Sequence, residues 1–126
     1  EFFNPPSMVE LVAGLLGSAP KDEDAWGAVV LRSLVAATAH ALGELSRVAG
    51  REFTTVRVAG GGSQSEAFCS LLAEKAGRLV LAGPVEATVL GNCGAQFLAS
   101  GTVESYGALE TLIRRSLNLR QYVPDD

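Results

Sequence analysis

Apolar residues recur every three or four positions along most of this chain, and that spacing is typical of helices with one buried face. The longest such pattern covers about residues 25–48. The acidic stretch Asp22–Asp24 before it suits the positive N-terminal end of a helix, and Gly50 favours a stop just after it. Ser7 can cap a shorter helix within the segment 5–16. Further helices are predicted over residues 65–76, 86–100 and 106–117.

Two short segments have the pattern of strands. Val56 and Val58 alternate with polar residues within 53–59, and residues 79–82 form a second apolar run. Strands that alternate with helices indicate an α/β fold with a parallel sheet. Two short strands are too few for a stable parallel sheet covered on both faces. We therefore expect a helix-rich domain with a short parallel sheet, completed by strands from outside the chain or from a second copy.

Composition limits the classes of function. A length of 126 residues with 48% hydrophobic residues suits one domain or a piece of one. Because the chain starts at Glu1 rather than at a methionine, we treat 1–126 as a partial domain. The net charge of −4 without a Lys/Arg cluster argues against nucleic-acid and anionic-membrane partners. No uninterrupted apolar run reaches the ~18 residues of a membrane span, and no secretory signal is visible.

Several single residues are interpreted as structural. Cys69 and Cys93 have no metal or disulfide spacing, which favours a reducing cytoplasm. Both are expected to be packed thiols, with a reactive thiol as the alternative for Cys93, which lies nearer the expected site. His40 has no second ligand at metal-binding spacing and is expected on a helix surface. No phosphate-binding role is assigned to the basic residues expected near a helix C-terminus and on a solvated face, which are Arg114, Arg115 and Arg120.

The run Gly60-Gly61-Gly62 directly follows the first predicted strand and precedes a helix. Glycine lets the backbone turn sharply and approach a ligand closely, and a helix N-terminus offers unpaired N–H groups to an anion. Ligands of parallel sheets also bind at the carboxyl ends of strands. The run is therefore either an anion-binding loop or a plain turn capped by Ser63 or Ser65. It has neither the Gly-Lys-Ser/Thr of a P-loop nor the glycine spacing of dinucleotide sites.

A second strand-to-helix connection covers residues 83–92. Glu86 in the first turn of the helix suits the helix dipole. It could instead orient a neighbouring loop or a nucleotide, but spacing alone favours the structural role. A glycine inside a helix costs about 1 kcal/mol relative to alanine, so Gly91 and Gly94 indicate close packing or a close ligand.

Three segments together resemble the FGGY family of carbohydrate kinases. They are residues 3–8 (FNPPSM), residues 60–64 (GGGSQ) and residues 82–92 (AGPVEATVLGN), with Gln96 beyond. They occur in order and with compatible gaps over essentially the whole chain. Within the family, the last segment is most similar to the rhamnulokinase group.

The resemblance implies an RNase H-like, actin-type ATPase fold with two lobes. The nucleotide lies between the lobes, and the sugar lies mainly on the N-terminal lobe. ATP and Mg²⁺ are the implied cofactors, with Mg²⁺ held mainly by residues outside this chain, and the rhamnulokinase group transfers the γ-phosphate of ATP to the 1-hydroxyl of L-rhamnulose. The resemblance assigns nucleotide binding to Gly60, Gly61, Gly62, Ser63, Gln64, Ser65, Glu86, Gly91 and Asn92.

The chain also departs from the family pattern. Ser65 stands where the family commonly has an asparagine that can bond the adenine, and serine is shorter with a single hydroxyl. No Asp-x-Gly-Thr phosphate loop occurs, so no residue is assigned to catalysis and the chain alone is expected to be inactive. The alternatives are a kinase for another sugar, such as xylulose or fuculose, and a non-catalytic self-associating module. The open edge of the first strand predicts a dimer or larger assembly.

Overall fold

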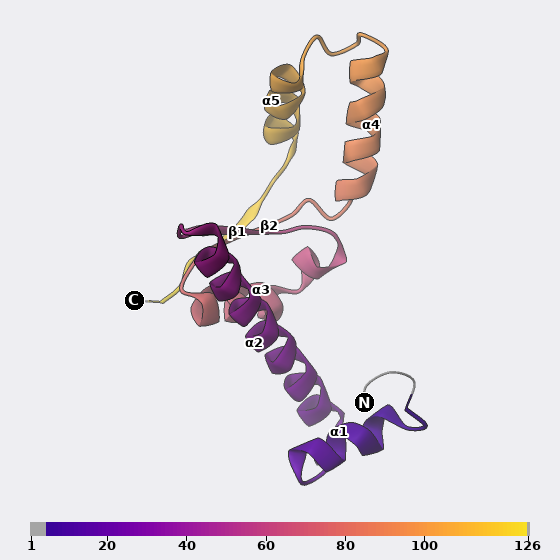
Figure 1. Cartoon of the computed structure of the whole chain (residues 1–126). Helices are drawn as coiled ribbons and strands as arrows, with labels where there is room; N and C mark the ends of the chain where they lie inside the picture. The colour runs from indigo at the N-terminus through magenta and orange to yellow at the C-terminus, as the bar shows by residue number, and fades with distance from the viewer. Residues whose placement is uncertain (1–4, 126) are drawn as a thin grey trace. The chain divides into compact units, whose positions relative to one another are not determined.

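The computed structural model of the protein describes residues 5–125 and is drawn in Figure 1. The chain divides into two compact units, one that ends at Leu34 and one that begins at Val35. Every helix and strand predicted from the pattern is present. The elements in chain order are α1 (Met8–Leu16), α2 (Glu23–Ala49), β1 (Thr55–Val58), the 3-10 helix η1 (Gly61–Gln64), α3 (Glu66–Ala76), β2 (Leu79–Ala82), α4 (Ala87–Ala99), α5 (Tyr106–Ser116) and β3 (Arg120–Tyr122).

The first unit contains α1 and the start of α2. The Ser7 hydroxyl accepts a hydrogen bond from the Glu10 amide at 3.3 Å, as expected of an N-cap. Gly17 ends α1 in the left-handed region, with φ of 77°. Asp22 caps α2, because its Oδ1 accepts from the Ala25 amide at 2.8 Å. The first two residues of the FNPPSM segment, 3 and 4, lie outside the described residues.

Helix α2 meets the length and hydropathy criteria for crossing a membrane, although the sequence contains no uninterrupted apolar run of that length. The two results differ because averaged hydropathy tolerates single polar residues, such as Arg32 and His40, inside a long apolar helix. Core helices of soluble proteins meet the same criteria, so this result alone assigns no membrane role to α2. His40 is exposed on the helix, as predicted.

The sheet in the second unit is mixed. β1 and β2 pair in parallel, with Thr55 opposite Leu79, as the pattern predicts. β3 pairs antiparallel with β2, with Tyr122 opposite Val80, so a strand that the pattern did not predict makes the sheet mixed. The chain returns from α5 to the free edge of β2, where three residues are enough to form an antiparallel ladder. The order β1-β2-β3 leaves β1 at one edge of the sheet.

The core lies on one face of this sheet, under α3. Cys69, Leu72 and Ala73 of α3 and Val80 and Ala82 of β2 form a fully buried cluster. Ala39 and Leu42, in the second half of α2, are partly buried and pack against this cluster. The Arg78 guanidinium fastens α2 to the start of β2, because it donates to the Leu42 carbonyl at 3.3 Å and to the Ser46 hydroxyl at 2.9 Å.

Helices α4 and α5 lie side by side beyond the sheet (Figure 1). A Cβ added to Gly94 would come within 2.9 Å of Leu109 Cδ2, so Gly94 allows the two helices to approach closely. The prediction that a helical glycine marks close packing is therefore confirmed for Gly94. An added Cβ at Gly91 meets nothing within 4 Å, so close packing within the described residues does not explain that glycine.

The two cysteines differ in burial. Cys69 is packed in the core as predicted, and burial raises the pKa of its thiol, partly offset by the nearby Arg120 guanidinium. Cys93 is exposed on α4, so its prediction as a packed thiol is wrong. The reason is that Cys93 lines an open hollow between α4 and α5 instead of packing against a neighbouring side chain.

We expect one thiol, that of Cys93, to react rapidly with a disulfide reagent in the folded protein. Cys69 should react only as the chain unfolds, because it is fully buried. Its raised pKa also favours the protonated thiol, which is less reactive than the thiolate. Counting reacted thiols with and without denaturant checks this. A Cys93→Ser chain should show no fast phase, and a fast phase in that chain would contradict the burial of Cys69.

Candidate functional site

The two loops singled out in the sequence meet at the carboxyl ends of β1 and β2. The Gly60 amide donates to the Pro84 carbonyl at 2.9 Å, and the Gly83 amide donates to the Val58 carbonyl at 2.8 Å. These bonds extend the connection between the parallel strands beyond their last ladder pair, to Gly60 and Pro84. The glycine run and the 83–92 segment therefore begin next to each other at the carboxyl ends of β1 and β2. Ligands of parallel sheets bind at this end of the strands.

The glycine run forms a tight turn that only glycine can begin. Gly60 has φ of 75° and ψ of −162°, a conformation that L side chains rarely adopt. The next four residues form η1, and the Ser63 hydroxyl donates to the Gly60 carbonyl at 2.7 Å. Ser63 is buried, with 1% of its surface exposed. Its hydroxyl therefore holds the loop together and does not face solvent.

Arg120 supports the same loop from the far end of the chain. Its guanidinium donates a hydrogen bond to the Ser63 carbonyl, and the two residues are 57 positions apart. Arg120 is exposed, as expected, and lies in β3 just beyond the C-terminal end of α5. The sequence carries no signal for this contact, since it depends on the pairing of a three-residue strand.

Ser65 caps the helix that follows the loop. Its hydroxyl accepts from the Phe68 amide at 3.3 Å, which confirms one of the two predicted caps. Gly61, Gly62 and Gln64 are exposed beside it. An added Cβ at Gly61 meets nothing within 4 Å, and one at Gly62 comes no closer than 3.8 Å to Val58 Cγ1. The outer side of the loop is thus bare backbone next to the N-terminus of α3, where an anion is favoured.

The acidic first turn of α3 works against the binding of an uncompensated anion. Glu66 follows Ser65 directly and lies in that turn. Its negative charge weakens the potential that the helix dipole offers at this end. A bound phosphate here would therefore be favoured when a cation accompanies it. Among the described residues, no three His, Cys, Asp or Glu side chains gather in a group that would hold a metal ion.

The predicted residues of α4 lie apart from the loop. Glu86 occupies the N-cap of α4, where its carbonyl accepts from the Leu90 amide at 3.0 Å while its carboxylate makes no cap bond. Gly91 and Asn92 are exposed on α4. Within residues 5–125, no hydrogen bond joins either of them to the glycine run. The structure thus brings together residues 60–65 with residues 83 and 84, and leaves Glu86, Gly91 and Asn92 on a neighbouring helix.

Comparison with known proteins gives a consistent match. Residues 3–100 match the C-terminal domain of the FGGY family of carbohydrate kinases. The chain is 35% identical to a rhamnulokinase of Halalkalibacterium halodurans over 97 residues, which are 77% of this chain and 21% of the relative. It is 38% identical to a rhamnulokinase of Lactiplantibacillus plantarum over 87 residues, which are 69% of this chain and 18% of the relative. The chain thus spans about a fifth of the length of the curated relatives it matches. The matched segment includes the whole of α2, the two joined loops and α4.

Proposed function

Because the chain belongs to the FGGY family of carbohydrate kinases, whose C-terminal domain has an actin-like ATPase fold, we propose that it is the nucleotide-binding portion of an ATP-dependent sugar kinase. The observation that supports this most is the junction of the two loops through the Gly60–Pro84 and Gly83–Val58 hydrogen bonds. It leaves bare glycine backbone beside a helix N-terminus at the carboxyl end of a parallel strand pair. This arrangement suits the phosphates of a nucleotide.

The residues have distinct parts in this proposal. Gly61 and Gly62 offer space for the phosphates, because neither carries a side chain there and both are exposed. Ser63 and Arg120 fix the loop from beneath, and Gln64 and Ser65 lie next to the base. Glu86, Gly91 and Asn92 form a wall when the nucleotide is bound. ATP supplies the phosphoryl group, and Mg²⁺ compensates its charge next to Glu66.

The substrate we propose for the intact enzyme is L-rhamnulose, phosphorylated at its 1-hydroxyl. Support comes from the two relatives named rhamnulokinase and from the AGPVEATVLGN segment. Residues outside this chain supply most sugar contacts and the catalytic groups, so xylulose or fuculose is the alternative substrate. We place the protein in the cytoplasm, in keeping with cysteines that are both free.

We expect the chain to bind Mg-ADP, and Gly61→Asp to weaken that binding tenfold or more. A carboxylate at Gly61 would project into the space proposed for the phosphates and repel them. The substitution should leave the fold intact, because Gly61 is exposed and its added Cβ meets no atom within 4 Å. Calorimetric titration of both chains with Mg-ADP measures the difference.

Gly107→Asp is the matched control. It adds the same charge at another exposed glycine, which lies in α5 and outside the proposed site. Binding that Gly107→Asp keeps and Gly61→Asp loses would place the phosphates on the glycine run. If the unchanged chain, Gly61→Asp and Gly107→Asp bind Mg-ADP with equal affinity, the glycine run does not bind the phosphates.

The second candidate is a non-catalytic module that associates with itself. β1 lies at an edge of the sheet, and such an edge can pair with another copy. A chain that binds no Mg-ADP and elutes as a dimer or larger assembly would favour this candidate. A monomer that binds Mg-ADP would favour the kinase.

A further inference from the structure

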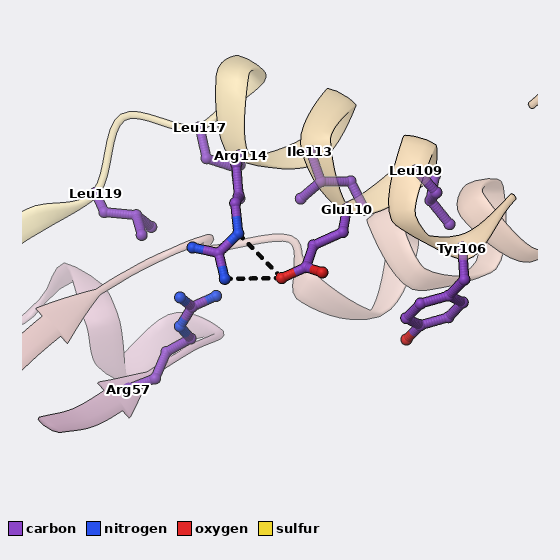
Figure 2. Close-up of a pocket in the computed structure, with 8 residues that line it drawn as sticks. All are labelled: Arg57, Tyr106, Leu109, Glu110, Ile113, Arg114, Leu117 and Leu119. Atoms are coloured by element: carbon purple, nitrogen blue, oxygen red, sulfur yellow. Dashed lines mark hydrogen bonds and ion pairs between the residues drawn. The ribbon is translucent and has the colours of Figure 1, made fainter.

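A cavity lies on the other side of β1 from the core. It has a volume of about 380 Å³ and is formed between β1 and α5 (Figure 2). Arg57 reaches it from β1, where it alternates with the partly buried Val56 and Val58 and so points away from the core. The other lining residues that matter here come from one side of α5: Tyr106, Leu109, Glu110, Ile113 and Arg114.

Of the two arginines that line this cavity, one is paired with a carboxylate of the described residues and the other is not. Figure 2 shows Arg57 and Arg114 directed toward one another across the cavity. Arg114 is held by Glu110 Oε1, with its Nε at 3.0 Å and its Nη2 at 2.7 Å. The Arg57 guanidinium has no hydrogen bond or ion pair within residues 5–125. Two guanidinium groups and one carboxylate leave the cavity with a net charge of +1.

This arrangement favours an oxyanion. Two like charges that face one space repel each other, and an anion placed between them relieves the repulsion. Guanidinium groups present planar pairs of N–H donors that match carboxylate and phosphate oxygens. Arg114 is already oriented by Glu110, so little side-chain entropy is lost there on binding. Arg57 has all of its side-chain donors available for a ligand.

The remaining walls are apolar. Leu109 and Ile113 line the cavity from α5, and Tyr106 adds an aromatic ring at its end. The volume of about 380 Å³ lies in the range of small-molecule sites. A ligand that fits both parts has an oxyanion joined to a compact apolar or aromatic group.

We propose that Arg57 and Arg114 form a binding site for a small aromatic or apolar oxyanion, between β1 and α5. The site uses none of the residues of the glycine run, so it is separate from the proposed nucleotide site. Either a carboxylate or a phosphate monoester provides the required oxyanion. The two sources are told apart by titration with benzoate and with phenyl phosphate.

The experiment is a titration of the chain with phenyl phosphate, benzoate and inorganic phosphate, followed by calorimetry and by backbone amide shifts. We expect saturable binding in the millimolar range or tighter for one of the two aromatic anions. Inorganic phosphate should bind about tenfold more weakly, because it makes no contact with the apolar wall. Shifted amides should cluster at Arg57 and along α5.

Variants of exposed residues make the test specific. Arg57→Gln and Arg114→Gln should each weaken binding about tenfold, since each removes a charge-assisted pair of bonds. Arg115→Gln is the matched control, because it removes the same charge from the next position of α5 and does not line the cavity. Glu110→Gln should strengthen binding, since Glu110 is the one carboxylate among the described residues that line the cavity. Gly61→Asp should leave the affinity unchanged.

The proposal is overturned if neither aromatic anion binds in the millimolar range. It is also overturned if Arg115→Gln weakens binding as much as Arg57→Gln, because that result indicates attraction by overall charge only. Loss of binding in Gly61→Asp would show that the probe occupies the glycine run instead. Circular dichroism of each variant establishes that the fold is kept, which is expected because Arg57, Arg114 and Arg115 are exposed.

Discussion

Replacing Leu72 with alanine is expected to lower the free energy of unfolding by about 2–5 kcal/mol, the range for large-to-small changes in a packed core. Leu72 is a large, fully buried side chain with 0% of its surface exposed. It belongs to the cluster that joins α3 to the sheet, with Val80 and Cys69 among its members. The loss combines the transfer of the removed methyl groups to water with the cavity that the surrounding residues leave unfilled. Urea denaturation of the two chains, followed by far-UV circular dichroism, gives the difference.

Leu45→Ala provides the comparison. Leu45 is also a helical leucine, but 52% of its surface is exposed. Its replacement should change the free energy of unfolding by no more than about 0.5 kcal/mol, because exposed positions lose little burial and alanine favours helix. Equal losses for Leu72→Ala and Leu45→Ala would contradict the placement of the core under α3.

The elements predicted from the sequence share strong local signals. Helix α2 follows from its long 3.6-residue pattern and its acidic start, and Asp22 of that acidic stretch also caps the helix. β1 follows from Val56 and Val58, which face the core as expected. β3 has no such signal, because Arg120-Gln121-Tyr122 is mostly polar and its pairing partner lies about forty residues earlier in the chain. Its strand conformation is decided by the free edge of β2, and tertiary pairing of that kind is not encoded locally.

The candidate site also has features that the sequence predicts and features that it does not. The glycine run and its helix were located from their order in the sequence, since a strand, three glycines and a capped helix have few possible geometries. The sequence does not distinguish Ser63 from Ser65 as the cap of that helix, and in the structure Ser65 forms the cap while Ser63 bonds within the loop. The support from Arg120 was missed, because side-chain contacts between distant segments leave no spacing pattern. The cavity at Arg57 was missed for the same reason, as it needs β1 and α5 placed together.

Gly60→Ala is expected to lower the free energy of unfolding by about 1–3 kcal/mol, the cost of a backbone conformation that only glycine adopts readily. Gly60 has φ of 75° and ψ of −162°. An added Cβ meets no atom within 4 Å, so the cost comes from backbone strain and not from a clash. If the loop relaxes to escape the strain, it gives up the Gly60–Pro84 bond, which joins the two loops, and the Ser63–Gly60 bond within the glycine run. Chemical denaturation measures the change, and Mg-ADP titration of the same chain should show weaker binding.

Gly61→Ala separates backbone strain from the simple addition of a methyl group. Gly61 is the next residue of the same run, its φ is not in the positive region, and its added Cβ also meets nothing within 4 Å. We expect its free energy of unfolding to stay within about 0.5 kcal/mol of the unchanged chain, because no bond or packing contact is lost. If the two substitutions destabilise the protein equally, the turn at Gly60 does not require glycine, and the loop has a different conformation from the one described. If only Gly60→Ala destabilises it, the strained turn is what holds the glycine run against the second loop.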